Sequence, residues 1–263
     1  MEQSSNVLLT DIRPGDIIFC DSHINDSWMP NAPSHLISLL HFGAPILQYA
    51  QEKWNKMLYD DQLEPSIIHT GIVIANDGEN LTIIDCIYPH SQQISFAYEK
   101  FHHTFKKLLV YRNPPVSAEV IRTAVNWTSS GRIYYPIGPQ FLGVGLMSRN
   151  WSSLFALKNE RGLFAEQSAV QGPPKDCEGR PIWMFCSFFV AAVCCAVDRS
   201  WDNIPARISS QTPLDLQHSL TMVGWAKVGQ FHFEGHEPPP QTWGAYCASY
   251  LVWSVSSLLS LHR

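Results

Sequence analysis

The sequence is short of charge and lacks the patterns that mark several common classes of protein. Of its 263 residues only 16% are charged, the formal net charge is -5, and no basic cluster marks a nucleic-acid-binding surface. No apolar run reaches the roughly 20 residues that a membrane-spanning helix needs, and there is no internal repeat. At 45% hydrophobic residues, the composition indicates a globular chain with a sizeable core. We therefore expect no nucleic-acid partner.

The cysteines also lack the spacings of metal and redox motifs. None of the seven forms a C-x-x-C pair, so we expect no metal and no other cofactor. Their odd number indicates a reducing compartment with several buried thiols. Cys20 and His23 place a thiol close to an imidazole, but a metal site would require more ligands at suitable spacing.

The two ends of the sequence bear on location. The first ten residues have neither a basic n-region nor an apolar h-region, so we expect a cytoplasmic protein, with export by a non-classical route as the alternative. The tail at residues 245–261 is apolar but rich in serine. We expect it to pack as a helix or strand, and a contact with a membrane surface is the alternative.

The order of the expected elements indicates an α+β fold. Runs of β-branched residues bounded by turn signals predict strands at residues 67–75, 81–87 and 105–111. Helical spacing predicts a helix at residues 117–127. The segment at residues 183–197 is too long for an ordinary strand and is apolar on all sides, which is typical of a central buried helix.

We treat residues 1–263 as one domain with two insertions. Leucine, alanine and tryptophan at helical spacing predict a helical insertion at about residues 33–64. Residues 129–182 are rich in glycine, proline and serine, and we expect an irregular insertion there, of a length that is usually functional or mobile.

The two strands at residues 67–87 carry a histidine and an aspartate. Alternate residues of a strand share a face. If Asn76 to Gly78 form the loop, His69 lies directly opposite Asp85, with Cβ atoms about 5 Å apart, as a base and its orienting carboxylate require. A turn one residue shorter would set His69 against Cys86 and send Asp85 to the other face. We prefer the first register because it keeps Cys86 on an apolar face.

Cys186 falls in the first turn of the predicted buried helix. The N–H groups and the positive end of the helix dipole stabilise a thiolate there, and the thiolate is the form in which cysteine attacks. The backbone N–H of Cys186 is also a suitable donor to an oxyanion. Cys194 and Cys195 fall mid-helix among alanines and valines, so we expect them to be packing residues.

Together these motifs resemble those of a known family. GDIIF at residues 15–19, HTGIVI at residues 69–74, an acid on the next strand and FCSFFV at residues 185–190 resemble the NlpC-type papain-like cysteine enzymes. Because the cysteine follows the histidine, the order is that of the circularly permuted YiiX- and YaeF-like branch. TPLDL at residues 212–216 is similar to a T-P-x-D-L element that follows the cysteine helix in that branch.

The resemblance implies a circularly permuted papain-like fold, in which a central cysteine-bearing helix packs on an antiparallel sheet. It implies Cys186 as the nucleophile, His69 as the base and Asp85 as the residue that orients the base. The chain departs from the family at Phe188, where the family has a glutamate, and at Asp85, where the family often has glutamate. The change at Phe188 concerns the substrate more than the mechanism.

These features predict a cysteine hydrolase that cleaves an amide, peptide or thioester bond through an acyl-enzyme. The first alternative is an N-acyltransferase that uses the same triad on a protein or lipid acceptor. The second is a catalytically inactive binding module on the same fold. The expected partner is a peptide, a protein or an acyl-group substrate, and the sequence favours no oligomeric state.

Overall fold

The computed structural model describes residues 9–21, 67–87, 90–97, 107–130, 133, 172–175, 179, 182, 184–204 and 208–232. The helical insertion predicted at about residues 33–64 and the apolar tail at residues 245–261 lie outside the described residues. So does most of the irregular insertion predicted at about residues 129–182.

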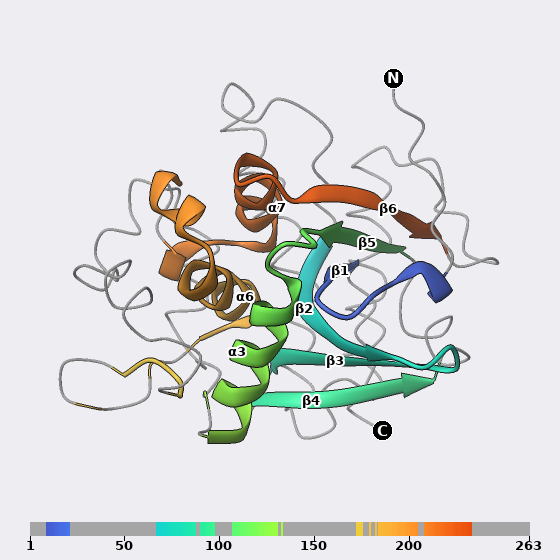
Figure 1. The fold of residues 1–263 in the computed structure, drawn as a ribbon, viewed down its shortest axis with the longest axis horizontal. Coiled ribbons are helices and arrows are strands. Elements are labelled where there is room, and N and C mark those ends of the chain that lie inside the picture. The colour runs from blue at the N-terminus through green and yellow to red at the C-terminus, as the bar shows by residue number, and fades with distance from the viewer. Residues whose placement is uncertain are drawn as a thin grey trace, which may run out of the picture.

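The scaffold is one antiparallel sheet of six strands (Figure 1). In spatial order the strands are β4 (His90–Ala97), β3 (Asn80–Ile87), β2 (Ile67–Asn76), β1 (Ile17–Asp21), β5 (Lys107–Arg112) and β6 (Ala226–His232). Every neighbouring pair is antiparallel. The first strand of the chain therefore lies inside the sheet, between β2 and β5.

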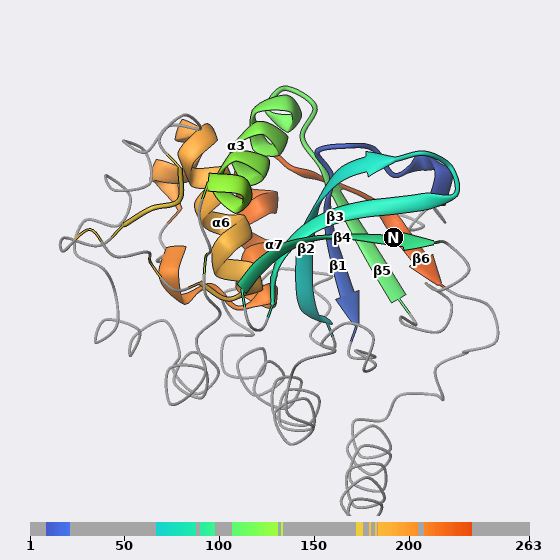
Figure 2. The ribbon, with the colours of Figure 1, turned by 90° about the horizontal axis from the view of Figure 1, so that it is seen from below.

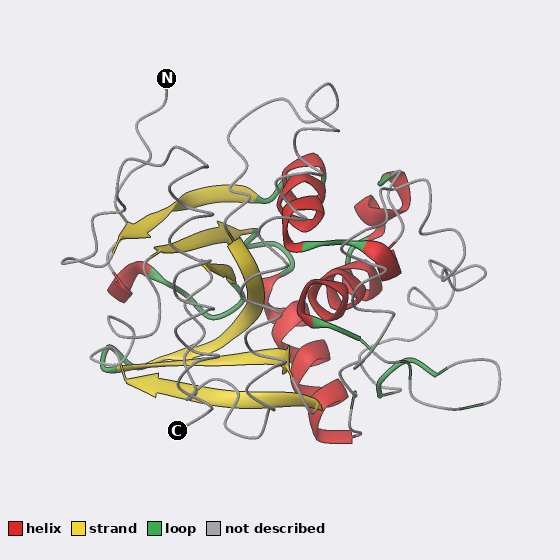
Figure 3. Ribbon diagram, turned by 180° about the vertical axis from the view of Figure 1, so that it is seen from behind, coloured by secondary structure: helices red, strands yellow, loops and turns green. Residues whose placement is uncertain are grey.

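Among the residues that the structure describes, three α-helices accompany the sheet, namely α3 (Ser117–Ser130), α6 (Cys186–Val197) and α7 (Pro213–Met222). The shorter 3-10 helices are η1 (Leu9–Asp11), η3 (Arg199–Asn203) and η4 (Ile208–Ser210). Figures 2 and 3 show the three α-helices gathered on one side of the strands. Within the described residues, no helix is long and apolar enough to cross a membrane.

The core lies between α6 and the sheet. All residues of α6 from Cys186 to Cys195 are buried, as an all-apolar helix requires. They pack against one face of the sheet and against α3, in a cluster that includes Ile17, Phe19, Ile72, Ile84, Cys86, Leu109 and Trp127. The predicted α+β class is confirmed, and so is the burial of Cys194 and Cys195.

The predicted elements recur with small shifts at their ends. The main difference concerns the start of the buried helix. The sequence predicts a helix from residue 183, whereas α6 begins at Cys186, and Met184 and Phe185 are not helical. β4 was not predicted, since HSQQISFA has few of the β-branched and aromatic residues that mark a strand. It is an edge strand, where half-exposed polar side chains are tolerated.

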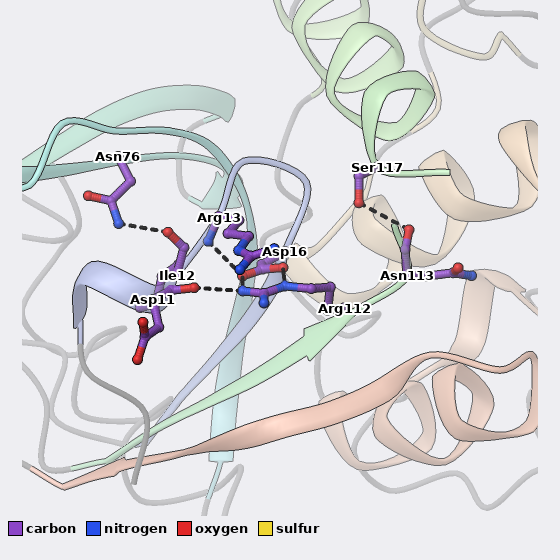
Figure 4. A network of polar contacts seen from close by, with 8 residues as sticks. All are labelled: Asp11, Ile12, Arg13, Asp16, Asn76, Arg112, Asn113 and Ser117. Atoms are coloured by element: carbon purple, nitrogen blue, oxygen red, sulfur yellow. Dashed lines mark hydrogen bonds and ion pairs between the residues drawn. The ribbon is translucent and has the colours of Figure 1, made fainter. Parts of the chain in front are cut away.

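A buried carboxylate holds the turn before β1 (Figure 4). Asp16 is 0% exposed, and its Oδ1 and Oδ2 accept hydrogen bonds from Nε and Nη2 of Arg112, each 2.7 Å long. The backbone N–H of Arg13 donates to Asp16 Oδ2 at 2.8 Å. Gly15 has a φ of +89°, and a Cβ there would collide with Ser117 of α3. The turn is thus tied to β5 and closely packed on α3.

We predict that Arg112→Met destabilises the fold by about 3 kcal/mol, because it leaves the buried Asp16 carboxylate without its bidentate partner. Glu119→Gln is the matched control. Its partner Arg122 is 64% exposed, so we expect a loss below about 1 kcal/mol. Urea unfolding of the three proteins measures both changes, and equal losses in the two variants would contradict this role of the buried pair.

Candidate active site

A histidine and an aspartate meet inside the sheet. Nε2 of His69, on β2, lies 3.0 Å from Oδ2 of Asp85, on β3. His69 is 3% exposed and Asp85 0%. Since an ionised carboxylate only accepts hydrogen bonds, Nε2–H is the donor. The sequence prediction that these two side chains share a face is confirmed.

The two strands do not pair in the predicted register. Val73 lies opposite Ile83, whereas the predicted loop would set it opposite Leu81. The reason lies in the turn. Asp77 Oδ1 accepts the backbone N–H groups of Glu79 and Asn80, at 2.9 Å and 2.6 Å. This hydrogen bonding moves the bend toward Glu79, beyond the predicted loop.

A β-bulge then decides which face Asp85 occupies. At the turn Asn76 pairs with Leu81, and continuing this register along the strands would put Asp85 on the face opposite to His69. The bulge at Ile74 adds one residue to β2 and restores the shared face. Asp85 is consequently the diagonal neighbour of His69 and not the directly opposite residue that we predicted.

Gly71 leaves room for this diagonal contact. A Cβ on Gly71 would lie 3.5 Å from the Cβ of Asp85 and 3.2 Å from the carbonyl oxygen of Ile84. The second distance is shorter than most Cβ contacts, so a larger residue would push β3 away. The glycine of the HTG sequence therefore helps to set the distance between His69 and Asp85.

Cys186 is the first residue of α6 and is 6% exposed. The residue before it, Phe185, provides no side-chain cap, and the first turn of α6 contains no acidic residue, so neither offsets the positive end of the helix dipole there. Cys186 also forms a side-chain hydrogen bond with His69. Because Asp85 engages Nε2, Nδ1 is the ring nitrogen left for the sulfur.

The electrostatics of the histidine reflect both neighbours. Burial lowers the pKa of His69, but the negative charge of ionised Cys186, the hydrogen bonds with Asp85 and Cys186, and the charge of Asp85 raise it to about 9. Burial raises the pKa of Asp85, and the hydrogen bond and charge of His69 offset only part of that rise. The structure thus brings together the three residues that the sequence singled out.

The approach to Cys186 is anchored by a residue whose role sequence reasoning missed. The thiol of Cys86 donates hydrogen bonds to the carbonyl oxygens of Met184 at 2.9 Å and Ile133 at 3.6 Å. Burial raises the pKa of Cys86 well above its usual value, as do the charges of Asp85 and Cys186. Because Cys86 follows Asp85 in β3, the same strand carries the carboxylate that contacts His69 and holds the chain just before α6.

A second anchor follows Cys186. Ser187 Oγ donates to the carbonyl oxygen of Gln211 at 2.6 Å. The TPLDL motif lies at a helix start, since Thr212 and Asp215 form a capping box that begins α7. Phe188, in the same turn of α6 as Cys186, is 4% exposed.

Cys20 is a further neighbour that the sequence did not reveal. It lies directly opposite His69 on β1 and is buried. His23, considered with Cys20 as a metal pair, lies outside the described residues, as do Cys177 and Cys247. In the described ranges no three His, Cys, Asp or Glu side chains converge as ligands of a metal ion.

In comparisons with known proteins, the chain matches no protein-family model, no curated protein and no solved structure.

We predict that His69 makes stability depend on pH above neutrality. Its pKa is about 9 in the folded protein, against an ordinary value of 6.5 for histidine. Its stabilising contribution is therefore full below pH 6.5 and is lost as the pH rises through about 9. The difference in free energy of unfolding between the wild type and His69→Gln should shrink by about 3 kcal/mol from pH 6 to pH 10. Urea unfolding at several pH values measures it, and a constant difference would refute the prediction.

Proposed function

We propose that this chain is a cysteine hydrolase that cleaves an amide, peptide or thioester bond through an acyl-enzyme on Cys186. The observation that carries the proposal is the position of His69, hydrogen-bonded through Nε2 to Asp85 at 3.0 Å and coupled to Cys186. A nucleophile, a base and a group that orients the base are the parts that covalent catalysis of this kind requires.

The proposed mechanism assigns one task to each residue. His69 accepts the proton of Cys186 and, as an imidazolium, pairs with the thiolate. The thiolate attacks the carbonyl carbon of the substrate, and the leaving group departs with the proton of His69. Water then attacks the thioester with His69 as general base. Asp85 holds the imidazole in one tautomer and orientation throughout.

We further propose that the fold is papain-like in the circularly permuted order. The order of motifs supports this assignment, as does a buried cysteine-bearing helix on an antiparallel sheet. In this reading α6 supplies the nucleophile after the strands have supplied the base and the carboxylate.

The first test of the proposal is selective reaction of Cys186 with iodoacetamide. At pH 7 we expect Cys186 to react first among the described cysteines. Cys86 and Cys194 should stay unmodified, because burial raises the pKa of each thiol well above its usual value. Peptide mass mapping identifies the modified residue. Cys186→Ala should abolish the fast reaction and Cys194→Ala should preserve it.

An unselective reaction would sink the enzyme proposal. It would favour the rival reading, in which the same fold is a binding module and Cys186 is an inert buried thiol. A Cys186→Ala protein that still reacts rapidly would do the same, because the fast thiol would then lie elsewhere.

The identity of the acceptor separates hydrolysis from acyl transfer. Cys186 is only 6% exposed, and the rings of Phe185 and Phe188 lie 5.9 Å apart beside it. This apolar setting is the observation that keeps an N-acyltransferase as the second candidate, since exclusion of water slows hydrolysis of a thioester.

We predict that acyl-Cys186, formed with p-nitrophenyl acetate, loses its acetyl group in buffer alone. Nα-acetyl-lysine, which offers a free amine, should not accelerate this loss. Intact-mass spectrometry follows the loss of the acetyl group, with Cys186→Ala as the control that carries none. If the acyl-enzyme persists in buffer and transfers its acetyl group to the amine, the protein is an acyltransferase.

A further inference from the structure

The chain just before α6 has a buried carbonyl group that the helix itself does not use. Phe185 is the N-cap of α6, and its carbonyl oxygen accepts the first helical hydrogen bond, from the backbone N–H of Phe189 at 2.8 Å. Met184 lies one residue earlier, so its carbonyl takes no part in the helix. Met184 is 0% exposed, and a buried carbonyl without a partner lowers stability. Its partner is the thiol of Cys86, which donates to it at 2.9 Å.

The second acceptor of Cys86 does not need the thiol in the same way. The carbonyl oxygen of Ile133 lies farther away, at 3.6 Å. It also accepts the backbone N–H of Ser91 at 2.7 Å. Among the described contacts, Met184 is therefore the acceptor that would lose its partner if Cys86 were replaced.

Cys86 is also joined to the base, because it follows Asp85 in β3. Asp85 contacts Nε2 of His69 at 3.0 Å, while Cys86 holds the chain two residues before Cys186. Burial raises the pKa of Cys86, and the charges of Asp85 and Cys186 raise it further. The side chain of Cys86 therefore stays a thiol, which is the form that donates a hydrogen bond.

We propose that Cys86 is a positioning residue for the nucleophile, whose hydrogen bond to Met184 sets the place of the Cys186 sulfur relative to the ring of His69. The inference rests on the proposed function, because such a position matters only if Cys186 and His69 act as a pair. One strand then fixes both members of the pair, the base through Asp85 and the nucleophile through Cys86. A displacement of about 1 Å can cost 10²-fold in rate, so a single hydrogen bond at this point has a measurable effect.

Three variants separate the hydrogen bond from the loss of a buried sulfur atom. Cys86→Ala removes the donor, and Cys86→Ser keeps one. Cys194→Ala is the matched control, since Cys194 is also 0% exposed and loses the same atom. With iodoacetamide at pH 7, we expect Cys186 to be alkylated about tenfold more slowly in Cys86→Ala than in the wild type. The rate should stay within about threefold in Cys86→Ser and about twofold in Cys194→Ala, as each keeps the donor at residue 86.

The imidazole of His69 provides a readout that a loss of packing alone would not move. Burial lowers the pKa of His69, and the charge of Cys186 is among the contributions that raise it to about 9. If the sulfur moves away, the ring should titrate about one pH unit lower in Cys86→Ala, in step with the tenfold slower alkylation. Nitrogen-15 NMR of the imidazole measures this change. A residue that served only stability would lower the Tm of Cys86→Ala and leave both the titration and the alkylation of the folded protein unchanged.

The outcomes distinguish this inference from the proposed function. Slower alkylation and a lower pKa of His69 in Cys86→Ala, both restored in Cys86→Ser, support the inference. Wild-type behaviour of Cys86→Ala overturns it, and so does an equal slowing in Cys194→Ala. In both cases a selectively reactive Cys186 leaves the proposed function intact. A wild type whose Cys186 does not react overturns the proposed function itself.

A further variant covers the case in which Cys86→Ala does not fold. Cys86→Val fills the space of the thiol without supplying a donor, so it should show the same two changes. Wild-type alkylation and titration in Cys86→Val overturn the inference. If neither variant folds while Cys194→Ala does, Cys86 serves the stability of the core and the inference fails.

Discussion

The hydrogen bond between His69 Nε2 and Asp85 Oδ2 constrains the rest of the site. It joins two buried side chains, so neither can turn toward solvent without leaving the other unpaired in a low-dielectric interior. With Nε2 engaged, only Nδ1 can serve the sulfur of Cys186. The start of α6 must therefore be placed to suit the ring of His69. Hydrogen bonds fix the chain on both sides of Cys186. Cys86 donates to the carbonyl oxygen of Met184 before it, and Ser187 after it donates to the carbonyl oxygen of Gln211.

The sheet positions His69 and Asp85, and α6 positions Cys186. The strands fix the imidazole and the carboxylate through backbone pairing, which tolerates little movement, while α6 carries the sulfur into the core with its uncapped N-terminus. The pKa of about 9 for His69 follows from this division. Burial alone would lower the pKa, and the charge of Cys186, the hydrogen bonds with Asp85 and Cys186 and the charge of Asp85 together outweigh burial. At the turn that leads into β1, the two hydrogen bonds from Arg112 to Asp16 fix the backbone in a similar way.

The residue types and periodicities of the sequence were enough to predict the central strands, the buried helix and the three residues that meet. The period of two along a strand placed His69 and Asp85 on one face. The register was wrong because the side chain of Asp77 moves the turn and a bulge at Ile74 compensates, and neither shows as a local pattern. The contacts of Cys86 with Met184 and of Ser187 with Gln211 join distant parts of the chain. The polar strand β4 resembles a loop in the sequence, because few of its residues favour a strand.

The protonation of His69 at neutral pH tests the central claim most directly, because the coupling of Cys186, His69 and Asp85 requires a charged ring. Nitrogen-15 NMR of the His69 imidazole distinguishes a ring protonated on both nitrogens from a neutral tautomer. We expect an imidazolium at pH 7 in the wild type, titrating near pH 9, and a much lower pKa in Cys186→Ala, where the negative charge is gone. A His69 ring that is neutral at pH 7, or one that titrates identically in both proteins, would contradict the account.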